Sequence, residues 1–80
     1  KEKFTMNKAR KQQLRKWLVD LEEIKSELEN ICSDEESYFD NIPENLQYSQ
    51  RASDSEEAID QMNEAVSSIE EAINAIEGIV

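Results

Sequence analysis

From Leu14 onward, apolar residues recur every seven positions, and this heptad repeat restricts the possible folds more than any other feature of the sequence. Such a repeat is typical of a helix that packs lengthwise against another helix. With Leu14 at position a and Trp17 at position d, position e is also largely apolar. The residues concerned are Leu14, Leu21, Leu28 and Ile42 at a, Trp17, Ile24, Ile31 and Tyr38 at d, and Leu18, Cys32 and Phe39 at e.

Pro43 ends this predicted helix, because proline lacks a backbone N–H and disfavours helical conformation in the residue before it. We therefore expect helices over about residues 7–41 and 51–78, joined by a connection at about 42–50. Two N-caps are candidates for the second helix: Ser49, or Ser53 with Glu56 completing a capping box.

The second predicted helix has its own heptad repeat, with small residues beside the apolar ones. Alanines that recur every seven residues let a neighbouring backbone approach closely. The repeat consists of Ile59, Val66, Ile73 and Val80 at a, Met62, Ile69 and Ile76 at d, and Ala58, Ala65 and Ala72 at g.

Together these elements predict an all-α, antiparallel two-helix hairpin of the coiled-coil type. Symmetry about the connection predicts that residue i faces a residue near 93 − i. Each helix has three apolar positions per heptad where a lone hairpin buries about two, so we expect a homodimer that closes a four-helix bundle. The predicted oligomer interface comprises Leu14, Trp17, Leu18, Leu21, Ile24, Leu28, Ile31, Ala58, Met62, Ala65, Ile69, Ala72, Ile73 and Ile76.

The net charge of −10 is unevenly distributed. Residues 1–16 carry seven of the nine basic side chains and one acid, whereas residues 17–80 carry eighteen acids and two basic side chains. The basic end, with Lys8, Arg10 and Lys11 extending past the second helix, either binds an anionic partner or pairs with acids of a second copy. Without interleaved aromatic residues, and in so acidic a chain, nucleic acid is disfavoured as the main partner.

Two further features have alternative interpretations. The connection is rich in apolar residues and forms either a protein-binding hot spot or a plug for the end of the bundle; its candidate binding residues are Tyr38, Phe39, Leu46 and Tyr48. Glu35 interrupts the a positions, and a carboxylate there must be paired, protonated or near water. We expect a structural role with Arg51, Tyr38 or Tyr48 as partner, rather than an acid/base function.

The sequence lacks the residues of common catalytic, metal-binding and phosphate-binding motifs. It has no histidine, one cysteine and one glycine, so it lacks a Glu-x-x-His metal motif, an activated nucleophile pair and a glycine-rich phosphate loop. We therefore expect no catalytic residues, no metal and no cofactor. With one thiol and no apolar run near the ~20 residues that span a bilayer, we expect a cytoplasmic protein that does not enter a membrane.

The segment from Met6-Asn7-Lys8-Ala9-Arg10 through Asp40-Asn41-Ile42-Pro43-Glu44-Asn45-Leu46-Gln47, with the Glu-Glu-Ala-Ile repeats that follow, resembles small uncharacterised acidic proteins encoded by phages and mobile elements of Gram-positive bacteria. The resemblance begins at Met6 and implies no biochemical activity. We accordingly expect Met6 to be the natural start, with residues 1–5 an added remnant or a disordered tail.

Three functions from different classes follow. The leading hypothesis is a non-enzymatic homo-oligomer that serves as a structural or protein-interaction module. The second is an anti-defence inhibitor, either a DNA mimic or a sponge for a nucleotide signal; a sponge would need Lys8, Arg10, Lys11, Arg15 or Arg51 in its binding pockets. The third is a nucleic-acid binder that uses the basic end.

Overall fold

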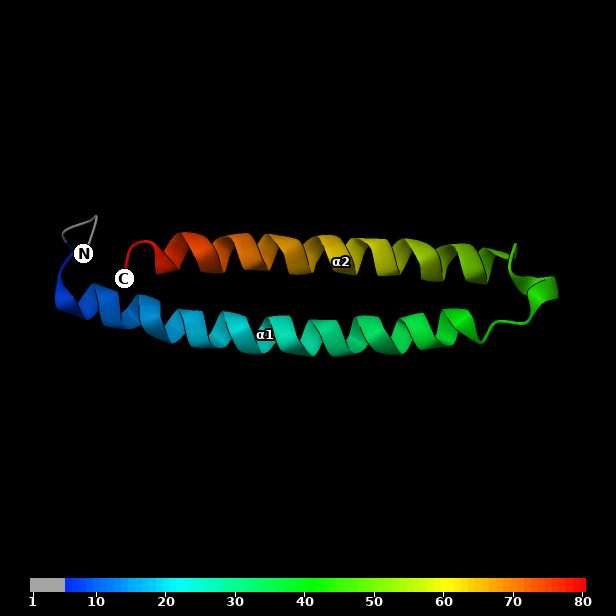
Figure 1. The fold of residues 1–80 in the computed structure, drawn as a ribbon, viewed down its shortest axis with the longest axis horizontal. Coiled ribbons are helices and arrows are strands. Elements are labelled where there is room, and N and C mark those ends of the chain that lie inside the picture. Colours follow the sequence, from blue (N-terminus) through cyan, green and yellow to red (C-terminus); the bar gives the residue numbers. More distant parts are fainter. Residues whose placement is uncertain (1–5) are drawn as a thin grey trace.

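The computed structural model describes residues 6–80, which form two antiparallel α-helices joined by a short connection (Figure 1). Helix α1 spans Lys8–Asp40 and helix α2 spans Gln50–Glu77, with a 3₁₀ helix, Glu44–Leu46, between them. The predicted all-α two-helix hairpin is therefore confirmed, with helix ends within one residue of those expected. The prediction that residues 1–5 are an added remnant or a tail lies outside the described residues.

Side chains cap the first turn of both helices. The Asn7 side chain accepts a 2.9 Å hydrogen bond from the backbone N–H of Arg10, and the Ser49 hydroxyl accepts one of 3.2 Å from the N–H of Ala52. Each cap satisfies a backbone donor that the first helical turn leaves without a partner. Of the two predicted caps of the second helix, Ser49 is the one used.

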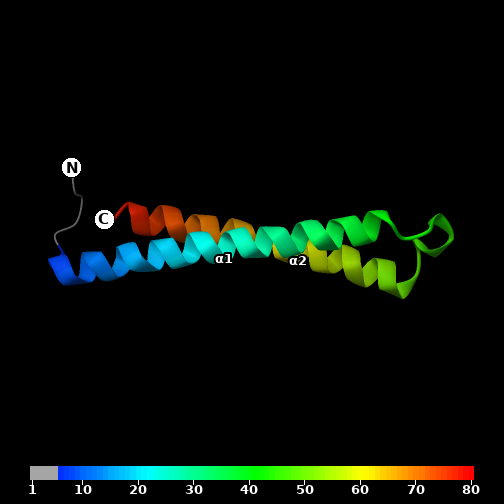
Figure 2. The same cartoon turned by 90° about the horizontal axis from the view of Figure 1, so that it is seen from below.

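The hairpin is a rod of 59 × 17 × 16 Å. Its radius of gyration, 18.1 Å, far exceeds the value of about 12 Å for a compact domain of this length. The helices cross near the middle of the rod (Figure 2), as expected for packing with a small crossing angle. Neither helix is long and apolar enough to span a membrane within residues 6–80.

The interhelical seam uses different faces of the two helices. In α2 it consists of positions a and d, and Val66 and Ile73 are its buried residues at these positions. In α1, however, the inward positions are a and e, and the d residues point outward. The α1 residues that are buried or half-buried recur at alternating spacings of three and four: Lys11, Leu14, Leu18, Leu21, Lys25, Leu28, Cys32, Glu35 and Phe39.

Three cross-helix contacts fix the register of the hairpin. Cys32 contacts Asn63, Lys25 contacts Glu70, and the third contact joins Glu35 to Ser55. The paired residue numbers add up to between 90 and 95, close to the predicted 93.

The hairpin encloses only a small core. Few apolar residues are buried in the described part of the chain, and no large side chain there is less than 2% exposed. The buried apolar residues are Cys32, Ile42, Ala52, Val66 and Ile73. Much of the apolar surface of the hairpin therefore remains exposed outside this core.

Candidate interaction surface

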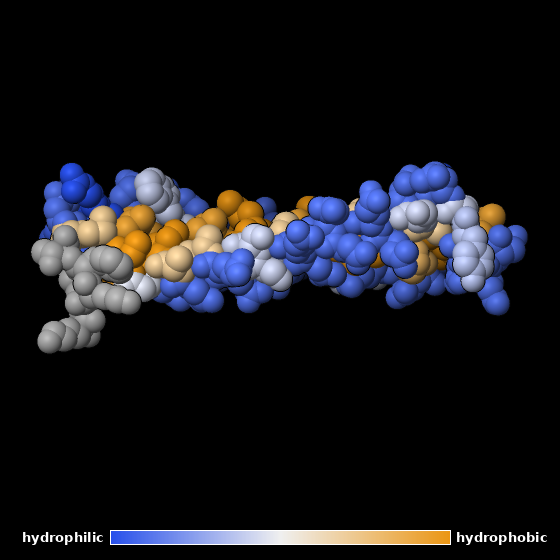
Figure 3. All heavy atoms as spheres, turned by 90° about the horizontal axis from the view of Figure 1, so that it is seen from above, coloured by the Kyte–Doolittle hydropathy of each residue, from blue (hydrophilic) through white to orange (hydrophobic). Residues whose placement is uncertain are grey.

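The d residues of α1 form an exposed apolar line along the rod, which we call the α1 stripe: Trp17, Ile24, Ile31 and Tyr38. Their exposed fractions are 48%, 52%, 58% and 43%. A spacing of seven residues keeps them on one side of the helix over three heptads. A band of hydrophobic surface is visible on one face of the molecule (Figure 3), running from the end with the termini toward the middle. Contiguous apolar surface of this kind is typical of an interaction site.

The alanines of α2 border the same face of the hairpin. A groove near the connection is lined by Tyr38 of the α1 stripe together with Ala58 and Arg51 of α2. Ala58 starts a line with a spacing of seven residues, which we call the alanine stripe: Ala58, Ala65 and Ala72. Ala72 is exposed, and the other two are half-buried. This face therefore combines a row of large apolar residues on α1 with a row of small ones on α2.

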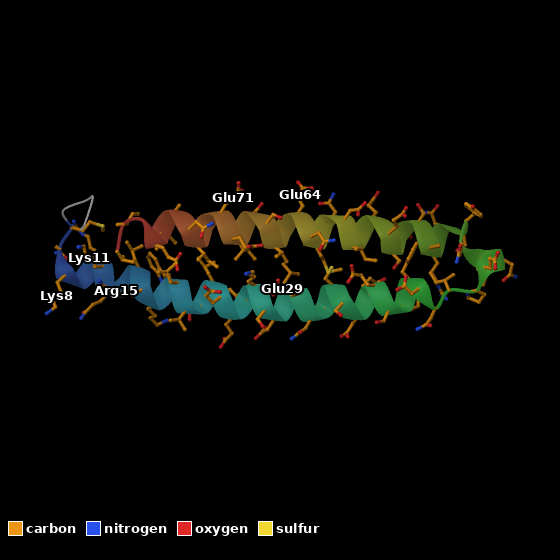
Figure 4. All side chains as sticks on the ribbon, in the orientation of Figure 1. Lys8, Lys11, Arg15, Glu29, Glu64 and Glu71 are labelled. Carbon is orange, nitrogen blue, oxygen red and sulfur yellow. The ribbon has the colours of Figure 1, made fainter. Side chains whose placement is uncertain are left out.

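The opposite face is acidic. A groove on that side is lined mainly by carboxylates of both helices, and Lys25 reaches Glu70 at 3.9 Å across the seam farther along the rod. Glu64 and Glu71 point away from α1 on the outer side of α2 (Figure 4). The groove residues are Glu36, Phe39, Asp40, Glu56, Ile59 and Asp60. The rod thus has one apolar face, while most of the exposed acids lie on its other sides.

Glu35 lies in the seam and is paired with a partner that the sequence did not reveal. Its Oε2 accepts a 2.6 Å hydrogen bond from the hydroxyl of Ser55. Arg51 and Tyr38 line the adjacent groove, but within residues 6–80 no ion pair or hydrogen bond joins either of them to Glu35. The expected structural pairing is present, with Ser55 in place of Arg51, Tyr38 or Tyr48.

The basic end contributes fewer exposed cations than its sequence indicates. Lys8 and Arg10 are exposed, but Lys11 is 7% exposed and continues the inner face of α1. Lys16 forms an ion pair of 3.2 Å with Asp20 on its own helix. Figure 4 shows Lys8, Lys11 and Arg15 together at the start of α1. Arg51 lies at the other end of the rod, so these cations do not gather into one anion pocket within a single chain.

The predicted binding cluster in the connection is divided between inside and outside. Ile42 is buried and Phe39 half-buried, so part of the cluster closes the end of the hairpin. Tyr48 is fully exposed, and Leu46 is 48% exposed. Backbone hydrogen bonds order the segment, among them one of 2.8 Å from the N–H of Leu46 to the carbonyl of Pro43. The two interpretations of this cluster therefore apply to different residues.

Cys32 is the one thiol, and it is buried. Its Sγ lies 3.5 Å from the side-chain oxygen of Asn63. Burial raises the pKa of the Cys32 thiol above its ordinary value, and the negative charge of Glu36 adds to the increase. A protonated, buried thiol is a poor nucleophile and a poor metal ligand. Within the described part of the chain, no group of three or more His, Cys, Asp and Glu residues could hold a metal ion.

The predicted oligomer interface separates into two sets of residues. One set packs inside the hairpin, and the other remains exposed on the apolar face. The packed set, buried or half-buried, is Leu14, Leu18, Leu21, Leu28, Ala58, Met62, Ala65, Ile69, Ile73 and Ile76. The exposed set is Trp17, Ile24, Ile31 and Ala72.

Comparison with known proteins gave no match: no family model, no curated protein and no solved structure is similar to this chain. The resemblance to small phage and mobile-element proteins therefore stays a prediction.

Proposed function

We propose that this protein is a non-enzymatic, self-associating helical module, in which the α1 stripe is the surface that other helices cover. The single observation that carries the proposal is the exposure of the stripe in a hairpin with so small a core. A chain of about this length obtains only roughly 3–5 kcal/mol from its own core, so covering the stripe would add stability that the hairpin lacks. The module would serve assembly or the presentation of the acidic surfaces, rather than chemistry.

A pair of matched variants tests the proposal. Ile24→Glu places a carboxylate in the middle of the stripe. Val19→Glu makes a similar change on the same helix, at a residue that is 66% exposed and lies on the other side of α1. In a symmetric dimer two unpaired carboxylates would be buried at roughly 1–3 kcal/mol each, so Ile24→Glu should weaken self-association about a hundredfold or more.

The readout is the solution mass by light scattering on a sizing column, at several loading concentrations. The wild-type chain and Val19→Glu should have the mass of an oligomer at concentrations where Ile24→Glu is monomeric. Equal masses for all three proteins would contradict the role assigned to the stripe, and a folded wild-type monomer at low micromolar concentration would contradict self-association itself.

A second candidate function draws on the acidic face. Carboxylates of both helices line its groove, and regularly spaced acids on a narrow rod can imitate the charge of a nucleic-acid backbone. On this alternative the protein is an anti-defence inhibitor that occupies the basic groove of a host nuclease. Restriction assays of phage growth with several defence systems test it: relief of restriction supports mimicry, and unchanged restriction throughout argues against it.

A further inference from the structure

We infer that the α1 stripe of one copy packs on the alanine stripe of a second copy, with both connections at the same end of a four-helix bundle. The inference rests on the proposed self-association and specifies its geometry. The two stripes border the same face of the hairpin, since Tyr38 and Ala58 line one groove. A twofold axis along the rod would therefore bring each stripe of one copy over the other stripe of its mate.

Large and small side chains fit together in this arrangement. Within one hairpin, two of the three cross-helix contacts join α1 and α2 residues whose numbers add up to 95. A twofold axis along the rod would place α1 against the second copy's α2 in the same register. It places each bulky stripe residue beside an alanine or a terminal isoleucine: Tyr38 by Ala58, Ile31 by Ala65, Ile24 by Ala72 and Trp17 by Ile79 of the second copy. The reverse arrangement stacks large residues on large ones and alanines on alanines, so its two seams would need different helix separations.

The distribution of charge also favours this arrangement. The residues that flank the α1 stripe on its outer side are acids, Asp20, Glu27 and Asp34. If α1 packed antiparallel on the second copy's α1, this row of acids would lie beside the same row of the second copy. Like charges placed opposite each other are destabilising. Packing on α2 instead sets the three acids beside side chains without charge: Ala75, Ser68 and Gln61.

The side of the rod that carries both stripes also offers enough area. It measures 59 Å by 17 Å, about 1,000 Å² in each copy, so complete pairing of two such sides buries at most roughly 2,000 Å². That value is at the upper end of standard protein–protein interfaces and at the lower end of obligate homodimers. The side that carries the two stripes is thus large enough for an interface between two hairpins.

The distance between the two connections distinguishes the arrangements. A spin label is attached at Gln47→Cys in a Cys32→Ser background, and the distance between labels is measured by pulsed electron resonance on a sample whose mass has been determined. Connections at the same end predict a distance of about 20–30 Å, set by interhelical spacings of 8–10 Å and the label arms. Connections at opposite ends predict a distance close to the 59 Å length of the rod.

Each outcome has one meaning. A short distance supports the inferred arrangement. A long distance in a sample with the mass of a dimer overturns the arrangement but leaves self-association standing. A monomeric mass without dipolar coupling overturns both, provided that the unlabelled wild-type chain is also monomeric.

Disulfide formation gives a second test if the labelled chain folds poorly. In the Cys32→Ser background, an equimolar mixture of Ile31→Cys and Ala65→Cys chains should form a disulfide-linked heterodimer on mild oxidation, while Glu27→Cys alone should stay largely uncrosslinked. Rapid dimerisation of Glu27→Cys, with no crosslink in the mixture, would contradict the inference.

Discussion

The hydroxyl of Ser55 in α2 donates a 2.6 Å hydrogen bond to the carboxylate of Glu35 in α1, and so compensates for an acid in the interhelical seam. The pair lies near the connection and joins residues twenty positions apart. A polar pair among apolar layers disfavours shifted alignments, because a shift would leave the carboxylate without its donor.

Replacing Ser55 with alanine should therefore lower the free energy of unfolding, because the substitution removes the hydrogen-bond donor of Glu35. Glu35 would keep its partly buried position without a donor, at a cost of about 1–3 kcal/mol. Urea denaturation at fixed protein concentration measures the effect. The double variant Glu35→Leu with Ser55→Ala should recover most of the loss, because both polar groups are then gone. A Ser55→Ala protein as stable as the wild type would contradict this role of the hydroxyl.

The buried thiol predicts a specific alkaline effect. The pKa of Cys32 is raised in the folded chain, so the folded state holds the thiol proton more tightly than the unfolded state does. This contribution to stability is complete below the ordinary pKa of 9.0 and is lost as the pH rises through the higher folded value. Denaturation curves between pH 7 and pH 10.5 should show a steeper loss of stability for the wild type than for Cys32→Ala. Parallel pH profiles would contradict the assignment.

Ile73 tests how much the small core contributes. It is among the most buried large side chains of the hairpin, at 5% exposed, and truncation to alanine leaves a cavity between the helices. Ile73→Ala should lower the free energy of unfolding by about 2–4 kcal/mol. Val19→Ala is the matched control: its side chain is 66% exposed, so we expect a change within about 0.5 kcal/mol. Thermal and urea unfolding at one concentration compare the two, and similar losses would mean that α2 does not pack as described.

The alanine stripe should tolerate no bulk if a second copy covers it. Ala72 is exposed in the hairpin, so phenylalanine there meets no obstacle within one chain. In the bundle it would overpack the contact with Ile24 of the other copy, and self-association should weaken about tenfold or more. Ser67→Phe adds a ring on a different side of α2 and should leave the dissociation constant nearly unchanged. Sedimentation equilibrium of both variants checks this, and equal constants would count against the stripe.

The sequence predicted the helices, the end of α1 before Pro43 and the approximate register, because these depend on local signals and on one symmetric connection. It did not predict which two of three apolar positions in α1 face α2. Hydropathy favoured position d, since Trp17, Ile24 and Ile31 are there while Lys11 and Lys25 interrupt position e. The structure turns position e inward, because lysine stems can line a seam while the charge reaches its edge, as Lys25 does toward Glu70.

The partner of Glu35 was missed for a related reason. Charge pairing suggested Arg51, but the register brings the neutral Ser55 closer to the carboxylate. A hydroxyl is a weak sequence signal, because serines are also common at caps and on exposed helix faces. Only the cross-helix register indicates which turn of α2 lies opposite Glu35, and that turn contains Ser55.

By this proposal, the hairpin depends on covering its apolar face with another copy of itself. The most direct measurement is the solution mass of the unmodified chain across a dilution series from about 100 μM to below 1 μM, with helicity followed by circular dichroism on the same samples. We predict a dimer at high concentration whose helicity falls as it dissociates. A monomer of constant, high helicity over the whole series would contradict the claim.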